Sequence, residues 1–337
     1  MPDLESRLEE FREDFQRVRS EVAKVLVGQE EVVRHTLIAL FAGGHCLLEG
    51  VPGLGKTLLV RTLAQVLELE YSRIQFTPDL MPADIIGTRL VVETDRGERR
   101  FEFQRGPIFG QIVLADEVNR ATPKTQSALL EAMQEREVTV GTESHSLGSP
   151  FLVLATQNPL EMDGTYPLPE AQLDRFIFKV NVPFPKREEL TEVRARTTDE
   201  YHADSGKVLD GPRIEQHQQL VRQIVVASHV RDYAVRLLLA THPDQPGSPE
   251  PIRRFVRYGG SPRGVQALLL GAKILAALDR RYNVGFEDLR AIAGPALRHR
   301  ILLNFEGEAE GMTPDALIEE VLRHVPEVAE GADILAS

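Results

Sequence analysis

The segment from Gly50 to Thr57 constrains the fold of this chain more than any other part of it. It reads Gly-Val-Pro-Gly-Leu-Gly-Lys-Thr and matches the pattern G-x-x-x-x-G-K-[ST]. An apolar run, His45–Glu49, precedes it, and a helical pattern, Lys56–Leu67, follows it. Glycines at such a turn let successive backbone N–H groups curl around phosphate oxygens, and the N-terminus of the helix adds a positive end. A strand, this loop and a helix in that order predict an α/β fold that binds a nucleotide.

The side chains of this loop suggest how it would hold a nucleotide and a metal ion. We expect Lys56 to reach the β- and γ-phosphates and the hydroxyl group of Thr57 to bind Mg²⁺. The candidate nucleotide-binding residues of the segment are Gly50, Pro52, Gly53, Leu54, Gly55, Lys56, Thr57 and Leu58.

A pair of acids follows another apolar run. Gln111–Ala115 leads directly into Asp116 and Glu117. Taken alone, two acids after a strand are most often a solvated turn or a helix cap, but open α/β sheets bind ligands at the carboxyl ends of their strands. Downstream of a phosphate-binding loop, we therefore expect Asp116 to hold Mg²⁺ through water. Glu117 would polarise the attacking water as a general base.

Three further polar residues are candidates for the same site. Asn158 follows the apolar run Phe151–Thr156, where its amide would orient the attacking water, although Asn before Pro is also a common turn initiator. Arg175 lies in Leu-Asp-Arg-Phe, and Arg263 lies in Ser-Pro-Arg-Gly. Arginine often supplies positive charge to a phosphate, sometimes from a neighbouring subunit. For any single arginine, however, a surface or interface ion pair is the commoner role.

Short apolar runs alternate with helical patterns between Val27 and Pro185. Continuous apolar runs are typical of strands buried on both faces of a parallel sheet, and the alternation predicts helices on both faces. The expected fold class is therefore α/β, with a parallel five-stranded αβα sandwich. The strand candidates are His45–Glu49, Tyr71–Phe76, Gln111–Ala115, Phe151–Thr156 and Phe178–Val182.

Two segments interrupt this alternation and are predicted to form β-hairpins. Residues 88–104 place the turn Asp95-Arg96-Gly97 between two strand-like runs, and residues 137–147 have Gly141 at or near a turn. Such hairpins are insertions into the sheet, and loops held by a rigid scaffold often carry function.

The segments on either side of this region are predicted to be helical. Before it, apolar residues spaced by four and three predict an amphipathic helix packed on the domain behind it or, alternatively, a coiled-coil arm. They are Leu4, Leu8, Phe11, Phe15, Val18, Val22 and Val25. After Pro185, helices are predicted over residues 217–228, 232–241, 262–279, 286–298 and 314–324. We therefore expect an N-terminal helix, 1–26, a core domain, 27–185, and an all-α domain, 186–337.

Charge and cysteine content narrow the class of protein. Among 337 residues, Lys and Arg number 39 and Asp and Glu number 51, which gives a formal net charge of −12. A protein that coats nucleic acid needs a basic surface, so this balance argues against a nucleic-acid partner. Cys46 is the only cysteine, the N-terminus is acidic, and the most apolar window is too short to cross a bilayer. We therefore expect a cytoplasmic protein without membrane insertion.

Two basic clusters need a separate interpretation. One is Arg253-Arg254 with Arg257, and the other extends from Arg298 to Arg300. At this net charge, we expect both to face a nucleotide or a subunit interface rather than DNA.

The order of these motifs resembles that of the AAA+ ATPases, and the resemblance is closest to the MoxR family. Three segments carry it: residues 116–135 (DEVNRATPKTQSALLEAMQE), 155–159 (ATQNP) and 164–176 (GTYPLPEAQLDRF). The resemblance extends from about Val27 to Leu303 and so covers most of the chain. It implies a P-loop core plus a helical lid, assembled as a ring that is usually hexameric.

The resemblance also implies roles for individual residues. Val27-Gly28 matches the segment that lines the adenine pocket, Asn158 matches sensor 1, and Arg263 on the lid matches sensor 2. Arg175 matches the finger that one subunit donates to the site of its neighbour, a role that Arg120, also near the expected subunit interface, could share or take over. The two hairpins match insertions that face the pore of the ring.

Members of the family are regarded as chaperone-like and act with proteins that carry von Willebrand factor A domains. We therefore expect a MoxR-type ATPase that binds ATP or ADP with Mg²⁺, forms a homo-oligomer and remodels or matures a protein partner. Two alternatives stay open. One is a motor subunit of a metal chelatase or of a nucleic-acid-directed complex, and the other is a slow nucleotide-dependent binding switch.

Overall fold

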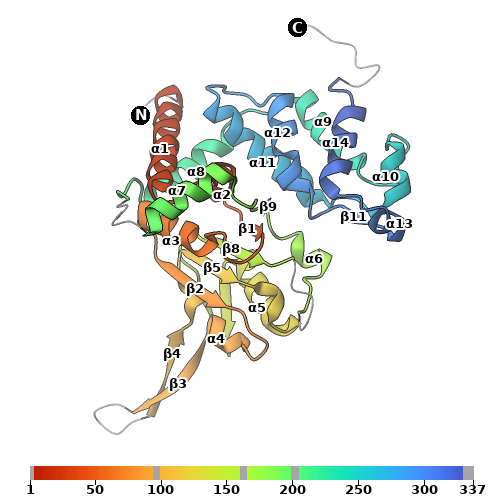
Figure 1. Ribbon diagram of the computed structural model, residues 1–337. Helices are drawn as coiled ribbons and strands as arrows, with labels where there is room; N and C mark the ends of the chain where they lie inside the picture. Colours follow the sequence, from red (N-terminus) through yellow and green to blue (C-terminus); the bar gives the residue numbers. More distant parts are fainter. Residues whose placement is uncertain (1–3, 94–98, 160–164, 199–204, 329–337) are drawn as a thin grey trace. The chain divides into compact units, whose positions relative to one another are not determined.

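The computed structural model describes residues 4–93, 99–159, 165–198 and 205–328. They form two compact units (Figure 1). The sheet unit comprises Glu13–Arg175 and Val180–Gln216. The helical unit comprises the residues before Glu13, the segment Phe176–Lys179 and the residues from His217 onward. Three unit boundaries therefore fall inside regular elements: one in helix α1 (Leu4–Val25), one in strand β9 (Phe178–Asn181) and one in helix α8 (Gly211–Arg222).

Five strands form the central sheet in the order β2-β5-β8-β1-β9. The adjacent pairs β2–β5, β5–β8 and β8–β1 are parallel. Nearly all side chains of β5 and β8 are buried, as expected for continuous apolar runs inside a parallel sheet. Besides β9, the strands are β1 Cys46–Glu49, β2 Tyr71–Gln75, β5 Ile112–Asp116 and β8 Leu152–Gln157. The predicted five-stranded α/β core is confirmed.

Helices connect these strands on both faces of the sheet. Helix α3 leads from β1 to β2 toward one edge, whereas α5 lies on the connection from β5 to β8, which advances in the opposite direction. Because such connections are right-handed, α3 and α5 cover opposite faces. The further helices in this region are α2 Glu30–Ala42, α3 Lys56–Val66, α4 Pro82–Ile86, α5 Pro123–Glu135, α6 Glu170–Leu173 and α7 Arg187–Thr198.

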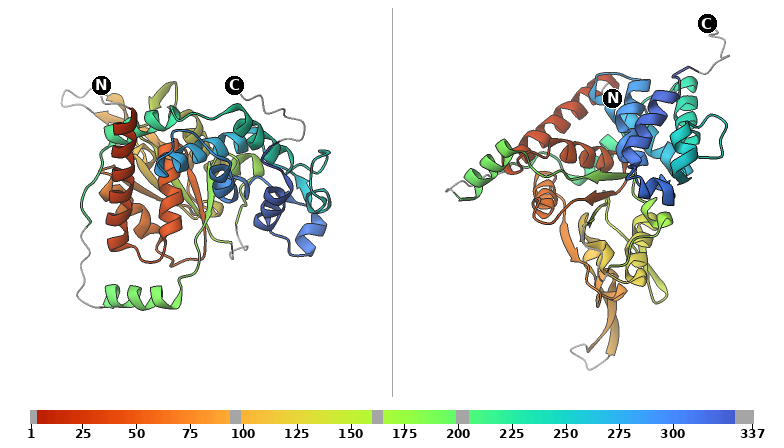
Figure 2. Two further views of the ribbon diagram at one scale, coloured as in Figure 1. Left: turned by 90° about the horizontal axis from the view of Figure 1, so that it is seen from above. Right: turned by 45° about the vertical axis from the view of Figure 1, so that its right-hand side comes forward.

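Both predicted hairpins are present in the sheet unit. Strands β3 (Gly87–Glu93) and β4 (Arg99–Arg105) pair antiparallel and extend away from the central sheet (Figure 1 and the right-hand view of Figure 2). Their predicted turn, residues 95–97, lies outside the described residues. Strands β6 (Glu137–Val140) and β7 (Glu143–Ser146) form the second hairpin. Gly141, at its turn, has a φ of +67°, a left-handed conformation that glycine adopts without strain.

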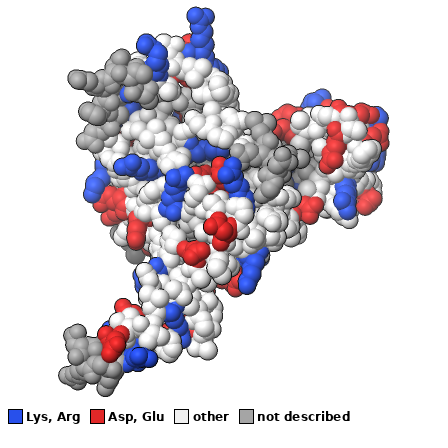
Figure 3. Space-filling view, turned by 60° about the horizontal axis from the view of Figure 1, so that its bottom comes forward, with Lys and Arg blue, Asp and Glu red and all other residues white. Residues whose placement is uncertain are grey.

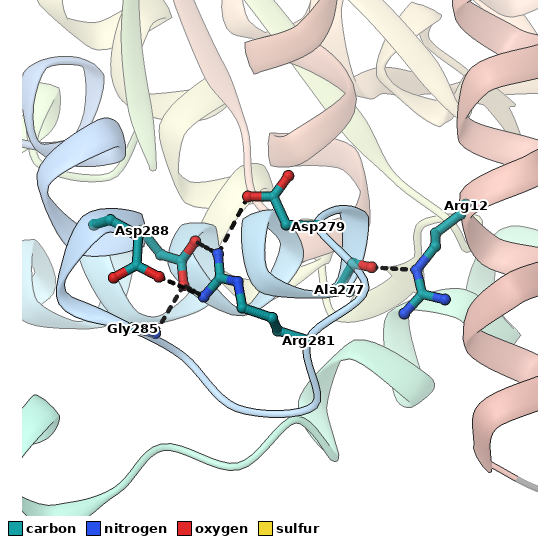
Figure 4. Close-up of polar contacts among 7 residues, drawn as sticks. Arg12, Ala277, Asp279, Arg281, Gly285 and Asp288 are labelled. Carbon is teal, nitrogen blue, oxygen red and sulfur yellow. Dashed lines mark hydrogen bonds and ion pairs between the residues drawn. The ribbon is translucent and has the colours of Figure 1, made fainter.

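The helical unit is built around helices that pack on one another. Arg281 forms hydrogen bonds of 2.6 and 2.7 Å with the buried carboxylate of Asp288, which also accepts the N–H of Gly285 and caps α12 (Figure 4). From the first turns of α1, Arg12 donates to the carbonyl of Ala277 at 2.5 Å. From α8 onward, the helices are α8 Gly211–Arg222, α9 Ser228–Leu239, α10 Glu250–Phe255, α11 Pro262–Leu278, α12 Phe286–Leu297, α13 Phe305–Ala309 and α14 Pro314–His324.

The predicted helical C-terminal part is confirmed, with one addition and one corrected boundary. Besides its helices it contains a short antiparallel ladder of β10 (Val256–Tyr258) and β11 (Leu302–Leu303). Strands of two and three residues are too short to produce a periodic pattern in the sequence. The helix predicted over residues 217–228 ends at Arg222, because Val225 forms a parallel bridge with Asn283 instead. Within the described residues, no helix combines the length and the apolar character needed to cross a membrane.

Candidate nucleotide site

The candidate site forms where four parallel strands end at one edge of the sheet. The phosphate-binding loop follows β1, the acidic pair Asp116 and Glu117 ends β5, and Asn158 follows β8. On the other side of β5, the edge strand β2 ends at Gln75, which is in register with Asp116. Because all four strands point the same way, side chains that are distant in the sequence are brought to one edge. The sequence alone predicted three of these four contributions.

The loop itself has the backbone of a phosphate cradle. Gly53 and Gly55 have φ values of +82° and +78°, in the left-handed region that favours glycine. Gly55 directly precedes α3, whose first residue is Lys56. The loop therefore presents backbone N–H groups and the positive end of an eleven-residue helix on the same side. Pro52, Gly53, Thr57 and Leu58 are exposed, while Leu54 is buried beneath the loop.

Lys56 folds back over this loop. Its ammonium group donates to the carbonyl oxygen of Gly50 at 2.5 Å. Burial lowers the pKa of Lys56 below its ordinary value, and the negative charges of Asp116, Glu117 and Glu49 partly oppose that shift. The lysine thus already lies in the electrostatic field of the acidic pair. An ammonium held by one carbonyl can exchange that partner for a phosphate oxygen without reorganising the loop.

The acidic pair is fixed by Thr156, a buried residue of β8. Its hydroxyl group donates to Asp116 Oδ1 at 2.6 Å and accepts the backbone N–H of Glu117 at 2.8 Å. Glu117 has a φ of +57°, which is unusual for a residue with a side chain and costs about 1–3 kcal/mol. The bond to Thr156 helps to hold this strained residue in place.

Strand β2 supplies side chains that the sequence analysis did not assign to the site. Gln75 donates to the carboxylate of Glu117 at 2.9 Å, and Arg73 forms an ion pair of 2.7 Å with Asp116. Arg73 also donates to the side-chain oxygen of Gln75 at 2.6 Å. The available signal was the alternation of these polar residues along an edge strand, which places both on one face.

The four remaining candidates lie in four different places. Asn158 is buried directly after β8. Arg175 is half-buried in the turn after α6, and Arg120 forms an ion pair of 3.2 Å with Glu117 of its own chain. Arg263 belongs to the helical unit, at the start of α11, where its backbone N–H donates to Ser261 Oγ at 3.1 Å.

The segment Val27-Gly28-Gln29 lies next to the loop. The buried side chain of Gln29 donates to the carbonyl of Leu54, which ties the two segments together. Gly28 has a φ of +73°, a left-handed conformation that favours glycine, and the side chain of Glu189 in α7 lies against it. Gln29 Oε1 is buried without a hydrogen-bond partner among the described residues. It can accept a hydrogen bond from a ligand.

These features fit a magnesium nucleotide. The cradle offers N–H groups and one cation to phosphates, the buried Gln29 oxygen offers an acceptor to a base, and the acidic pair offers oxygen ligands of the kind Mg²⁺ prefers. Thr57 is exposed at the first turn of α3, as a hydroxyl ligand must be.

Comparisons with known proteins agree with this arrangement. Residues 45–178 match the family described as "ATPase family associated with various cellular activities (AAA)", and residues 252–321 match the AAA lid domain. The chain is 42% identical to Chaperone MoxR1 of Mycobacterium tuberculosis, over 92% of this chain and 81% of that protein. It is 32% identical to Protein MoxR of Methylorubrum extorquens, over 96% and 97% of the two chains. A solved structure from Cytophaga hutchinsonii, provisionally named an ATPase, has a TM-score of 0.89 at 40% identity and covers 97% of this chain and 98% of its own.

Proposed function

Because the chain belongs to the MoxR family of AAA+ ATPases, we propose that it hydrolyses Mg²⁺-ATP in an oligomeric ring and uses this cycle to remodel or mature a protein partner. The family implies nucleotide binding. The observation that supports hydrolysis most directly is the pre-positioned acidic pair beside Lys56, with Glu117 held by Gln75 and by Thr156. A site that only bound nucleotide would not need a strained, separately anchored second acid.

Each residue would have a defined task in this reaction. The loop N–H groups and Lys56 would bind the phosphates, and Thr57 and Asp116 would hold Mg²⁺, which supplies positive charge to the phosphoryl group. Glu117 would accept a proton from the attacking water, and Asn158 would orient that water. Arg263 and, from a neighbouring subunit, Arg175 would neutralise charge that develops on the phosphates.

Two substitutions test the site. Lys56→Ala removes a charged hydrogen bond to phosphate and should weaken ATP binding roughly ten- to hundredfold. Glu117→Gln keeps the shape of the side chain but removes the base, so hydrolysis should fall about 10²–10⁴-fold while ATP still binds. Calorimetric binding and steady-state phosphate release measure the two effects. Undiminished ATP affinity in Lys56→Ala would refute the site, and near-normal turnover in Glu117→Gln would remove Glu117 as the base.

The proposed partner is a protein, with a von Willebrand factor A domain protein as the first candidate. On the face drawn in Figure 3, Lys and Arg side chains lie close to Asp and Glu side chains. Together with the net charge of −12, this distribution favours a protein over nucleic acid. The ATPase rate should therefore rise with such a partner and not with DNA. The opposite result would support the nucleic-acid-directed alternative, and no turnover under any condition would support the binding switch.

A further inference from the structure

The second basic cluster has a different environment from the one expected. Arg298, His299 and Arg300 follow helix α12, and we call these three residues the clasp. The prediction that they face a nucleotide or an interface does not fit their burial, because His299 is 4% and Arg300 is 6% exposed. They contact main-chain carbonyl groups inside the helical unit instead.

The clasp holds the short segment Phe176–Lys179. Arg300 donates to the carbonyl of Phe176 at 2.8 Å and to that of Ile177 at 3.3 Å. Arg298 donates to the carbonyl of Lys179 at 3.1 Å. The planar guanidinium groups can donate several hydrogen bonds in fixed directions, so they hold a main chain more rigidly than lysine could. The clasp therefore binds three of the four carbonyl groups in the segment.

His299 completes the contact. Its Nε2 atom lies 3.0 Å from the carbonyl of Phe176 and 2.8 Å from Arg300. It can donate to the carbonyl when the proton is on Nε2, and it can accept from Arg300 when the proton is on Nδ1. Burial and the neighbouring Arg300 charge lower the pKa of His299 well below its ordinary value, so the ring is neutral.

The side chains of the segment are anchored as well. Phe176 and Phe178 are fully buried. Phe178 packs against Gly271 of α11, where a Cβ atom would lie only 3.0 Å from the phenylalanine ring, so glycine provides the space. The other end of α12 is fixed by the Arg281 and Asp288 pair (Figure 4). The clasp thus directly follows a helix whose N-terminus is fixed by hydrogen bonds.

The segment begins directly after Arg175, and the boundary between the two units falls between Arg175 and Phe176. We propose that the clasp positions Arg175: by fixing the next residue of the main chain, it sets the direction in which the arginine points toward the phosphate of an adjacent subunit. This inference rests on the proposed function, in which Arg175 acts in trans. Arg298, His299 and Arg300 are then positioning residues, and movement of α12 is transmitted to the finger.

Arg300→Met tests the clasp, because methionine keeps an unbranched apolar stem and removes the guanidinium group. A misplaced finger should lower kcat roughly ten- to hundredfold, while the affinity for an ATP analogue and the assembly state stay as in the parent protein. Arg290→Met is the matched control. Arg290 lies within α12, which precedes the clasp, and donates to the carbonyl of Leu322 and to the hydroxyl of Tyr233 rather than to the segment. Its loss should leave kcat unchanged.

Mixed rings distinguish positioning of the finger from damage to the variant's own site. Lys56→Ala subunits have a defective site and an intact finger, whereas Arg300→Met subunits have the reverse. Each interface joins the finger of one subunit to the site of its neighbour. In an equal mixture about half of the sites and about half of the fingers are intact, so roughly a quarter of all sites should regain hydrolysis. Wild-type kcat in Arg300→Met, or no recovery on mixing, would overturn the proposal.

A reference mixture separates this proposal from the proposed function. Arg175→Ala with Lys56→Ala must also recover activity if the finger acts in trans. If the reference mixture fails, the trans role of Arg175 is wrong; if it recovers and the Arg300→Met mixture does not, the clasp alone is wrong. Should Arg300→Met not fold, Arg300→Lys replaces it in the same mixtures. Lysine keeps the positive charge but cannot donate the several hydrogen bonds of a guanidinium group. Arg300→Lys should therefore lower kcat less than Arg300→Met, and hydrolysis should recover in the same way when it is mixed with Lys56→Ala.

Discussion

At the scale of single residues, the hydroxyl group of Thr156 connects both acids of the site. Thr156→Val keeps the shape of the side chain but removes the hydroxyl group. The carboxylate of Asp116 and the backbone N–H of Glu117 then each lose a hydrogen bond. We expect the free energy of unfolding to fall by about 1–3 kcal/mol, and hydrolysis to fall by a larger factor than ATP binding. Chemical denaturation and single-turnover kinetics measure the two effects. Thr88→Val, at an exposed position of β3, is the control; equal effects of the two variants would contradict the assignment.

A second residue predicts how stability depends on pH. His45 is buried, where its Nδ1 atom accepts the N–H of Val153 and its Nε2 atom donates to the carbonyl of Met133. Burial lowers the pKa of His45 from 6.5 to about 4. Because the unfolded chain binds a proton more readily between these values, stability should be lost as the pH falls from 6.5 toward 4, by up to about 3 kcal/mol.

Denaturation in urea at several pH values checks this loss. The amide group of the glutamine in His45→Gln does not titrate. The slope of the free energy of unfolding against pH should therefore be smaller in this variant, by the contribution of up to one bound proton. His299 is also buried and neutral and contributes to the pH dependence in the same direction. Its contribution is present in both the parent protein and His45→Gln, so it does not affect the difference between them. An identical slope in the two proteins would mean that His45 is not the titrating group.

At the scale of elements, the two hairpins contact each other. Phe103 of β4 and His145 of β7 stack with ring centroids 4.0 Å apart, and Arg89 of β3 forms an ion pair of 2.7 Å with Glu143. The stack is worth about 0.5–1.5 kcal/mol and the half-exposed ion pair less. His145→Ala should therefore raise amide hydrogen exchange in both hairpins together while nucleotide affinity stays constant. Faster exchange in β6–β7 alone, or an equal effect from the exposed control His324→Ala, would contradict the coupling.

The elements that the sequence predicted correctly are those with a strong local pattern. The strands β5 and β8 are continuous apolar runs, and the loop before α3 has a fixed order of glycines and a lysine. The contributions of Arg73 and Gln75 could not be predicted, because they depend on which strand lies beside β5. The burial of Arg300 was missed for a related reason: consecutive charged residues are normally exposed, and only the tertiary fold shows the carbonyl groups that surround them. The domain limits at residues 185–186 stay a prediction.

At the scale of the whole molecule, a finger donated in trans makes turnover depend on assembly. We expect the rate per subunit to rise with protein concentration and to level off once rings are complete. Arg175→Ala should abolish this rise without preventing assembly, which sedimentation or light scattering can verify. Arg120→Ala should lower turnover at every concentration, since Arg120 contacts Glu117 of its own chain. A rate per subunit that is independent of concentration would exclude a site shared between subunits.

The helical unit contains the residues before Glu13, and the chain returns to it only at Phe176–Lys179 and from His217 onward. The apolar side chains of Leu8 and Phe11 are fully buried there, and Arg12 bonds to a carbonyl 265 residues further along the chain. At about 5–20 residues per second, the ribosome needs roughly 10–50 seconds to deliver that partner. During this time the amphipathic start of α1 has no completed surface to pack on. Newly made chains therefore pass through a stage in which this helix is open to holdase chaperones and to aggregation, and no fragment that begins at His217 contains the whole unit.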